Sequence, residues 1–163
     1  IGSSLVGSEM CIRDRFYDLQ AITEAAHQVG AFAGYDLAHA AGNVPLSLHK
    51  WDVDFAVWCS YKYLNSGPGG PGGVFLHNRH GNDPDFPRLA GWWGYKESDR
   101  FLMRKDFVPM PGAAGLQIST PQIIAFAPHW VSLALVRKAG IASLFEKSKQ
   151  LTAYLEFAIQ YLQ

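Results

Sequence analysis

Apolar and polar residues alternate along the first half of the chain in a pattern typical of mixed helices and strands. Residues 17–29 place Leu, Ile, Ala and Val at helical spacing and end at Gly30, a common helix stop. Residues 31–35, 54–60 and 73–77 are short apolar runs, which predict three buried strands. This succession of helix, strand, crossover and strand predicts an α/β layered fold.

The second half of the chain is irregular at first and then helical. Residues 61–73, a Tyr-Lys-Tyr-Leu-Asn stretch followed by a run rich in Gly and Pro, predict a loop. Residues 78–120 show no period, and an irregular segment of that length predicts a functional role. Residues 121–139 and 141–162 return to helical spacing on either side of Gly140, so two helices are expected.

The first fifteen residues differ from the rest of the chain. Residues 1–15 show neither helical nor strand periodicity and join a regular pattern abruptly at about Phe16. We interpret them as a non-native leader. The last helical pattern carries no stop signal, so we expect the chain to be an interior part of a longer protein.

The composition of the chain indicates which kinds of partner the protein has and where in the cell it lies. Fourteen basic and fourteen acidic residues balance one another, so no surface for nucleic acid or an anionic membrane is expected. The apolar runs are too short to span a bilayer and no secretory leader opens the chain, which predicts a soluble, cytoplasmic protein. Cys11 and Cys59 lie in dissimilar contexts that suggest neither a disulfide framework nor a metal site, and Cys59 is expected in a buried strand.

Lys62 is the strongest candidate for chemistry. A lysine forms an imine with an aldehyde only when its amine is partly deprotonated, which a desolvated position favours. Lys62 follows an apolar strand, lies between Tyr61 and Tyr63, and precedes glycines that let the backbone approach a ligand. Taken alone, a lysine at the end of a strand is more often a surface charge.

Asp36 and His39 follow the first predicted strand and suggest a partner for that lysine. A carboxylate that faces a pyridine nitrogen keeps it protonated, and an imidazole can donate to the ring oxygen or phosphate of the same cofactor. Taken singly, an aspartate such as Asp36 is more often a turn or helix cap, and a histidine such as His39 is more often packed in the protein. The joint pattern of Asp-x-x-His after one strand, Lys62 after the next and a Gly-rich loop predicts a pyridoxal 5′-phosphate (PLP) site.

Four stretches of the chain resemble kynureninase, a family of PLP enzymes. They are Tyr-Asp-Leu-Ala-His-Ala-Ala-Gly-Asn-Val at 35–44, Trp-Cys-Ser-Tyr-Lys-Tyr-Leu-Asn at 58–65, Leu-Ala-Gly-Trp-Trp-Gly at 89–94 and Leu-Gln-Ile-Ser-Thr-Pro at 116–121. The resemblance runs in order from about Phe16 to the last residue. It implies part of a fold-type I PLP-dependent large domain over residues 16–122, with a mainly parallel sheet and flanking helices. Residues 123–163 would then be a connecting helix and the start of the C-terminal small domain.

The resemblance also implies roles for individual residues near the cofactor. Lys62 would form the covalent link to the cofactor aldehyde, and Asp36 would pair with the pyridine nitrogen. His39 would lie beside the cofactor. Tyr61 would contact the phosphate and assist proton transfer.

Trp92 and Thr120 match family positions that reach the phosphate of the neighbouring subunit's cofactor. The resemblance therefore implies a homodimer with an active site shared between subunits. Two other readings stay open: Trp92 with Trp93 as a hydrophobic anchor at an interface, and Thr120 as the cap of the following helix, with Pro121 in its first turn.

The activity that the resemblance implies is hydrolytic cleavage of a carbon–carbon bond. L-Kynurenine, 3-hydroxy-L-kynurenine or both would give anthranilate or 3-hydroxyanthranilate and L-alanine, in tryptophan catabolism or NAD biosynthesis. We expect this chain alone to be inactive, because segments that contact the cofactor and substrate in the family lie outside it. The alternatives are a PLP enzyme similar to cysteine desulfurase or selenocysteine lyase, and a non-catalytic protein with the same fold.

The remaining polar motifs receive no chemical role. Gly67–Gly73 lacks the Lys-Ser/Thr ending of a nucleotide-binding P-loop, so ATP binding is not expected. Its expected role is structural: it lets the chain pass close to the cofactor. Asp54 and the charged residues Lys96, Glu97, Asp99 and Arg100 are expected to serve turns and a solvated face.

Overall fold

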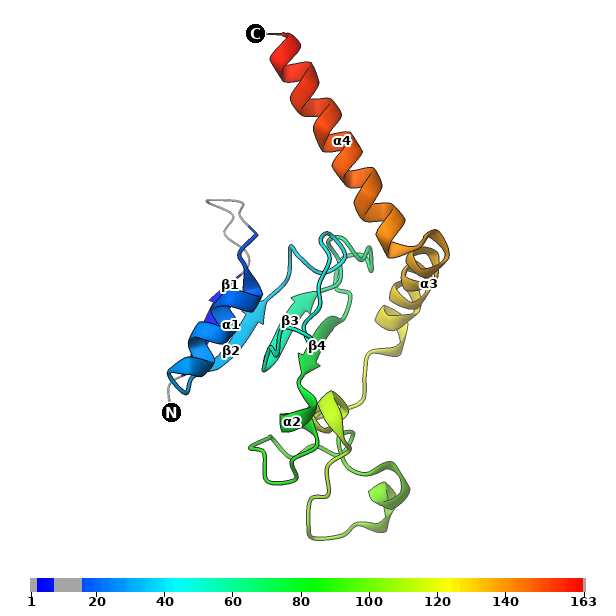
Figure 1. Cartoon of the computed structure of the whole chain (residues 1–163). Helices are drawn as coiled ribbons and strands as arrows, with labels where there is room; N and C mark the ends of the chain where they lie inside the picture. Colours follow the sequence, from blue (N-terminus) through cyan, green and yellow to red (C-terminus); the bar gives the residue numbers. More distant parts are fainter. Residues whose placement is uncertain (1–2, 8–15, 163) are drawn as a thin grey trace.

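The strands form one sheet in the computed structural model, which describes residues 3–7 and 16–162 (Figure 1). Within these residues the strand order is β1-β2-β3-β4. The strands are β1 (Ser3–Gly7), β2 (Phe32–Asp36), β3 (Phe55–Cys59) and β4 (Gly72–Leu76). β2 is parallel to both β1 and β3, whereas β4 is antiparallel to β3. The predicted α/β fold is confirmed, and so are the three strands predicted from the apolar runs.

The burial of the strands differs from the prediction. β2 is buried at Ala33, Gly34 and Tyr35, but β3 is fully buried only at Ala56, and Val57 remains 42% exposed. The prediction that Cys59 lies in a buried strand is wrong, because Cys59 is only half-buried. Within the described part of the chain, only one face of β3 is covered by other residues, although the strand is apolar on both faces.

The strand β1 lies where the sequence predicted no regular element. Ser3 to Gly7 pair in register with Phe32 to Asp36 of β2. The edge of a strand offers unpaired N–H and C=O groups to any extended segment, so this pairing needs no side-chain periodicity. The rest of the predicted leader, residues 1–2 and 8–15, lies outside the described residues, and its non-native origin stays a prediction.

The helix α1 (Leu19–Gln28) packs against β2 and fixes the core that supports the site. Asp18 caps it by accepting a hydrogen bond from the Ala21 N–H at 3.0 Å. The Tyr35 hydroxyl lies 2.8 Å from Thr23 Oγ1 and donates to the Leu19 carbonyl at 3.0 Å. The shared core residues are Leu19, Ala33, Tyr35, Leu37, Ala40, Ala41, Val53 and Ala56. This core anchors the chain on both sides of the C-terminal end of β2.

The reversal of direction at β4 sends the chain to the far end of the sheet. Leu76, the last residue of β4, pairs with Phe55, the first residue of β3. The segment that follows therefore leaves the sheet at the end opposite Asp36 and Cys59, and Figure 1 shows it gathered beyond β4. We call residues 78–118 the loop lobe.

The loop lobe is mostly irregular, as predicted, with three short helical turns. These are α2 (Asn78–Gly81) and the 3-10 helices Glu97–Leu102 and Gly112–Leu116. Its two halves are joined by hydrogen bonds from Lys96 N to the Val108 carbonyl and from Met110 N to the Gly94 carbonyl, both 2.8 Å long. The lobe is thus folded onto itself.

Two helices follow, as predicted from the spacing of apolar residues. They are α3 (Ile123–Ala139) and α4 (Ile141–Tyr161), separated by Gly140. The Ser132 hydroxyl of α3 donates to the Leu64 carbonyl at 2.7 Å, which ties this helix to the loop after β3. No helix in the described part of the chain has the length and apolar character needed to cross a membrane.

The N-terminus of α3 excludes one reading of Thr120. The helix begins after Gln122, whose side chain makes no capping hydrogen bond. Thr120 and Pro121 both precede this position. The interpretation of Thr120 as the helix cap, with Pro121 in the first turn, is therefore wrong.

Candidate functional site

The C-terminal ends of β2 and β3 meet at one end of the sheet because the two strands are parallel. Beyond β2, Leu37 N donates to the Val57 carbonyl at 2.7 Å and so continues the pairing by one residue. The Asp36 carboxylate accepts from Ala38 N at 3.0 Å, which turns the chain. The next residues form a helical turn, with Ala41 N donating to the Leu37 carbonyl at 2.8 Å. This turn carries His39 toward the segment after β3.

The segment after β3 is a closed loop with Lys62 near its middle. The Ser60 hydroxyl donates to Ser66 Oγ at 2.7 Å and also contacts the Pro71 carbonyl, and Ser66 N donates to the Ser60 carbonyl at 3.1 Å. Both serines are buried. Sequence reasoning missed this pair, although two serines that flank a short polar stretch were the available signal.

Lys62 and His39 are brought into direct contact across 23 positions of sequence. Lys62 Nζ lies 2.7 Å from His39 Nε2, and both residues are half-buried. When the amine is protonated it donates, and His39 Nε2 must then be the unprotonated, accepting nitrogen of its ring. The Tyr61 ring centroid lies 5.9 Å from the same Nζ. An amine, an imidazole and a phenol therefore converge at the end of the sheet where Asp36 lies.

Trp92 and Thr120 do not join this group, since they lie in and just after the loop lobe. A Cβ atom on Gly91 would lie 2.2 Å from Ile118 Cα, so only glycine lets these two backbone segments touch. Trp92 and Thr120 are thus carried by adjacent segments, and both are exposed, Trp92 by 47%. The residues proposed from sequence fall into two sets, associated with opposite ends of the sheet.

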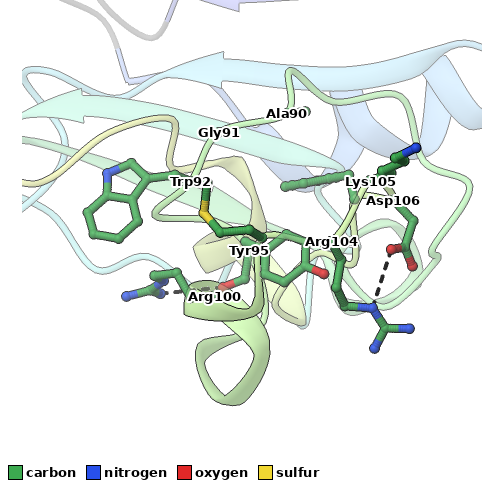
Figure 2. A pocket seen from close by; sticks show the side chains of 10 residues that line it. Ala90, Gly91, Trp92, Tyr95, Arg100, Arg104, Lys105 and Asp106 are labelled. Carbon is green, nitrogen blue, oxygen red and sulfur yellow. Dashed lines mark hydrogen bonds and ion pairs between the residues drawn. The ribbon is translucent and has the colours of Figure 1, made fainter.

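A cavity of about 310 Å³ lies beside Trp92 in the loop lobe. Figure 2 shows the Trp92 indole and the Arg100 side chain at one end of it, and Arg104, Lys105 and Asp106 at the other. The Arg100 guanidinium carbon lies 4.5 Å from the ring centroid of Trp93 and 5.5 Å from that of Trp92. The prediction that Arg100 belongs to a solvated face is wrong, because neighbouring indole rings attract the cation.

The prediction that Asp54 serves only a turn and a solvated face is also wrong. Asp54 is 2% exposed and its carboxylate accepts a hydrogen bond from Ala33 N at 2.7 Å. Arg79 Nη2 and His80 Nε2 each lie 2.6 Å from Oδ1, and His27 Nε2 lies 2.8 Å from Oδ2. The position of Asp54 beside buried β2 explains its burial, which its own sequence neighbours did not indicate.

The environment of Asp54 changes its acidity. Burial alone would raise the pKa of this carboxyl, but the hydrogen bonds from His80, Arg79, His27 and Ala33 N outweigh it and hold the pKa well below its usual range. The carboxylate is therefore ionised at neutral pH. Because it lies just before β3, at the end opposite Lys62, we assign it to the stability of the sheet.

Comparison with known proteins shows similarity over most of the chain. The family described as aminotransferase class-V matches residues 15–163. A kynureninase from Flavobacterium johnsoniae is 48% identical over 95% of this chain and 36% of its own length. A kynureninase from Myxococcus xanthus is 52% identical over 97% of this chain and 37% of its own. The chain spans roughly a third of the length of these curated relatives.

Solved structures with low sequence identity share the fold. The cysteine desulfurase CsdA from Escherichia coli has a TM-score of 0.70 at 19% identity, covering 98% of this chain and 38% of that one. An alanine–glyoxylate aminotransferase from Nostoc sp. has a TM-score of 0.64 at 19% identity, covering 94% and 39%. A C-DES variant with glycine covalently linked to its PLP cofactor has a TM-score of 0.69 at 15% identity, covering 89% and 38%. At these identities the similarity describes the fold.

Proposed function

Because this chain belongs to the aminotransferase class-V family, we propose that it forms the lysine-bearing part of a PLP-dependent kynureninase. The contact that carries the proposal is the 2.7 Å approach of Lys62 Nζ to His39 Nε2, at the end of the sheet where Asp36 lies. The sequence identity of about half with kynureninases favours this activity over that of the cysteine desulfurases, which share the fold at 19% identity or less.

The donor set at this end of the sheet fits PLP. When bound, PLP supplies an aldehyde that condenses with amines and a pyridinium ring that draws electrons from the α-carbon of an amino acid. Lys62 offers the amine that such a bond needs, and it lies half-buried with its Nζ 2.7 Å from His39 Nε2. Asp36 offers the carboxylate for the pyridine nitrogen, and His39 and Tyr61 offer groups for the ring oxygen and phosphate.

Three side chains of the site, those of Lys62, His39 and Tyr61, would take part in proton transfer. Lys62 Nζ, once the amine of the substrate takes its place, would accept the proton from the substrate α-carbon, and His39 lies close enough to share that proton. Tyr61 would donate a proton to the carbon that becomes the methyl group of L-alanine. Water would add to the side-chain ketone of L-kynurenine or 3-hydroxy-L-kynurenine, and cleavage of the bond between the β- and γ-carbons would release anthranilate or 3-hydroxyanthranilate and leave the β-carbon that Tyr61 protonates.

Trp92 and Thr120 would complete the site of a neighbouring copy. They are carried on adjacent segments and they follow β4 toward the end of the sheet away from Lys62. An exposed indole and hydroxyl there suit contact with a phosphate held by another subunit. We therefore propose a homodimer, with residues 16–122 in the large domain and residues 123–163 leading into the small one.

Anthranilate fluorescence after addition of L-kynurenine and PLP to the full-length protein that contains this sequence tests the proposal. Lys62→Ala should abolish release, because no amine remains to hold the cofactor. The matched control is Lys50→Ala, since Lys50 is exposed and lies before β3 rather than after it. That variant should retain the activity of the unaltered protein.

The outcomes separate the rival activities. Anthranilate release that depends on Lys62 supports a kynureninase. PLP binding with release of L-alanine from L-cysteine but not from L-kynurenine would move the assignment to a desulfurase. No PLP binding at all would leave only the fold.

A further inference from the structure

Arg100 is held against the Gly-Trp-Trp-Gly segment of the loop lobe by several contacts. Its Nη2 donates to the Trp93 carbonyl at 2.8 Å and to the Tyr95 carbonyl at 3.4 Å. Its guanidinium lies over both indole rings, at 4.5 Å from the centroid of Trp93 and 5.5 Å from that of Trp92. One side chain therefore fixes both the backbone and the rings of this segment.

The positive charge of Arg100 is stabilised by contacts other than an ion pair. Among the described residues, no carboxylate lies within ion-pair distance of its guanidinium. Among the described residues its buried Nε has no hydrogen-bond acceptor, so the two carbonyls, the aromatic rings and Met110 Sδ, which lies 3.7 Å from Nη2, are the groups that stabilise the cation. A planar guanidinium suits this arrangement, because it can donate in its plane and stack on rings with its face.

The Trp92 indole is restrained on one side and open on the other. It makes edge contacts with the ring of Trp93, at a centroid distance of 5.4 Å, and with that of Phe101, at 5.8 Å. Phe101 follows Arg100 in the same 3-10 helix, so this helix supplies two of the three groups around the indole. The side chain remains 47% exposed, which leaves an edge free for a ligand.

We propose that Arg100 is a positioning residue that orients Trp92 for contact with the cofactor phosphate. This inference rests on the proposed function, in which Trp92 serves the PLP of a neighbouring subunit. Arg100 itself would not touch the cofactor. Its effect on PLP should therefore pass entirely through the indole of Trp92.

The test is a double-mutant cycle in the full-length protein. Arg100→Lys keeps the charge but loses the planar fork, and Trp92→Phe removes the indole. The affinity for PLP is measured by titration of the apoprotein, and the packing of the tryptophans by near-UV circular dichroism without PLP. Arg104→Lys is the matched control, since Arg104 is an exposed arginine of the same lobe that pairs with Asp99 and Asp106.

We expect Arg100→Lys and Trp92→Phe each to weaken PLP binding about tenfold, the lower end of the effect of residues that orient a binding group. The double variant should bind PLP no more weakly than the single variant with the lower PLP affinity. Arg100→Lys should also change the near-UV signal, whereas Arg104→Lys should change neither quantity. If Arg100→Lys fails to fold, Arg100→Met, which keeps the apolar stem, replaces it in the same cycle.

Two results would overturn the inference about Arg100. Neither would affect the proposed function, provided that the unaltered protein binds PLP. One is an unchanged PLP affinity in the folded Arg100 variant. The other is a double variant whose loss equals the product of the two single losses, because Arg100 would then act independently of Trp92. An unaltered protein that binds no PLP would overturn the proposed function as well.

Discussion

The buried carboxylate of Asp54 lies 2.6 Å from Nε2 of His80, and this pair joins the start of β3 to the turn after β4. The other oxygen of the carboxylate reaches Ala33 N of β2 at 2.7 Å and His27 of α1 at 2.8 Å. Four elements, α1, β2, β3 and α2, therefore meet at one ionised group. Such a group stabilises the sheet only while every contact is made, because a buried charge without partners is costly.

Replacing Asp54 by asparagine should destabilise the protein by about 3 kcal/mol, the range found when one member of a buried ion pair is removed. The amide cannot balance Arg79, and it cannot accept hydrogen bonds at both of its terminal atoms. Urea denaturation of the full-length protein gives the change. Asp52→Asn is the control, because the Asp52 side chain is 56% exposed. This replacement should lower the free energy of unfolding by less than about 1 kcal/mol. Equal losses in the two variants would contradict the assignment.

Stability should fall as the solution is acidified, in two stages. Burial, together with the nearby charge of Arg79, lowers the pKa of His77, so its neutral form is favoured in the folded protein. Stability is then lost as the pH falls below the unfolded value of about 6.5. The pKa of Asp54 is also lowered in the folded protein, so its contribution is present above its unfolded value of about 3.9 and is lost as the pH falls further.

The free energy of unfolding, measured by urea denaturation from pH 7 down to about pH 3, checks both stages. His77→Gln should flatten the first stage and Asp54→Asn the second. A curve that rises on acidification, or that is the same in all three proteins, would exclude these two groups as the cause.

Replacing His39 by phenylalanine should weaken PLP binding about tenfold, as expected for a residue that orients a binding group. The ring keeps a similar shape but loses the nitrogen that lies 2.7 Å from Lys62 Nζ. Titration of the apoprotein with PLP measures the change. His49→Phe serves as the control because His49 is exposed and stacks on His77, away from Lys62. Equal PLP affinities in the two variants would show that the contact with His39 is dispensable.

Replacing Gly91 by alanine should separate the segment of Trp92 from that of Ile118. The added Cβ would lie 2.2 Å from Ile118 Cα and 2.4 Å from its carbonyl oxygen, so backbone must move. We expect a loss of about 1–3 kcal/mol in stability, typical of overpacking. Gly112→Ala is the comparison: no atom lies within 4 Å of the added Cβ, and only its φ of 68° opposes alanine, at about 1 kcal/mol. Thermal unfolding of both variants measures the difference, and a smaller loss at Gly91 would argue against this contact.

Periodicity and local stop signals predicted the elements but not their burial. The helices α1, α3 and α4 and the strands β2, β3 and β4 all lie within one or two residues of the predicted ranges. Periodicity reports which positions are apolar, whereas the exposure of Val57 and Cys59 depends on what covers β3. The strand β1 was missed because its pairing uses backbone groups, which leave no pattern in the side chains.

The sequence allowed us to predict which residues meet at the ends of parallel strands. It did not allow us to predict contacts between segments that share no sequence pattern. Lys62 and His39 come together because β2 and β3 run in the same direction, as the mainly parallel sheet implied by the family resemblance led us to expect. The partners of Asp54 and Arg100 come from segments with no shared pattern, so both residues were misassigned to solvent. The roles proposed for Asp36, His39, Tyr61, Lys62, Trp92 and Thr120 stay predictions.

If each site is shared between two copies as proposed, the antiparallel course of β4 lets two defective copies complement one another. In the proposed dimer, each site takes Lys62 from one copy and Trp92 from the other. A mixture of Lys62→Ala and Trp92→Ala subunits would then contain hybrid dimers in which both lesions fall on the same site, leaving the second site whole. Mixing the two preparations would therefore give more activity than the average of the two unmixed ones, because the strand direction places Lys62 and Trp92 at opposite ends of each copy.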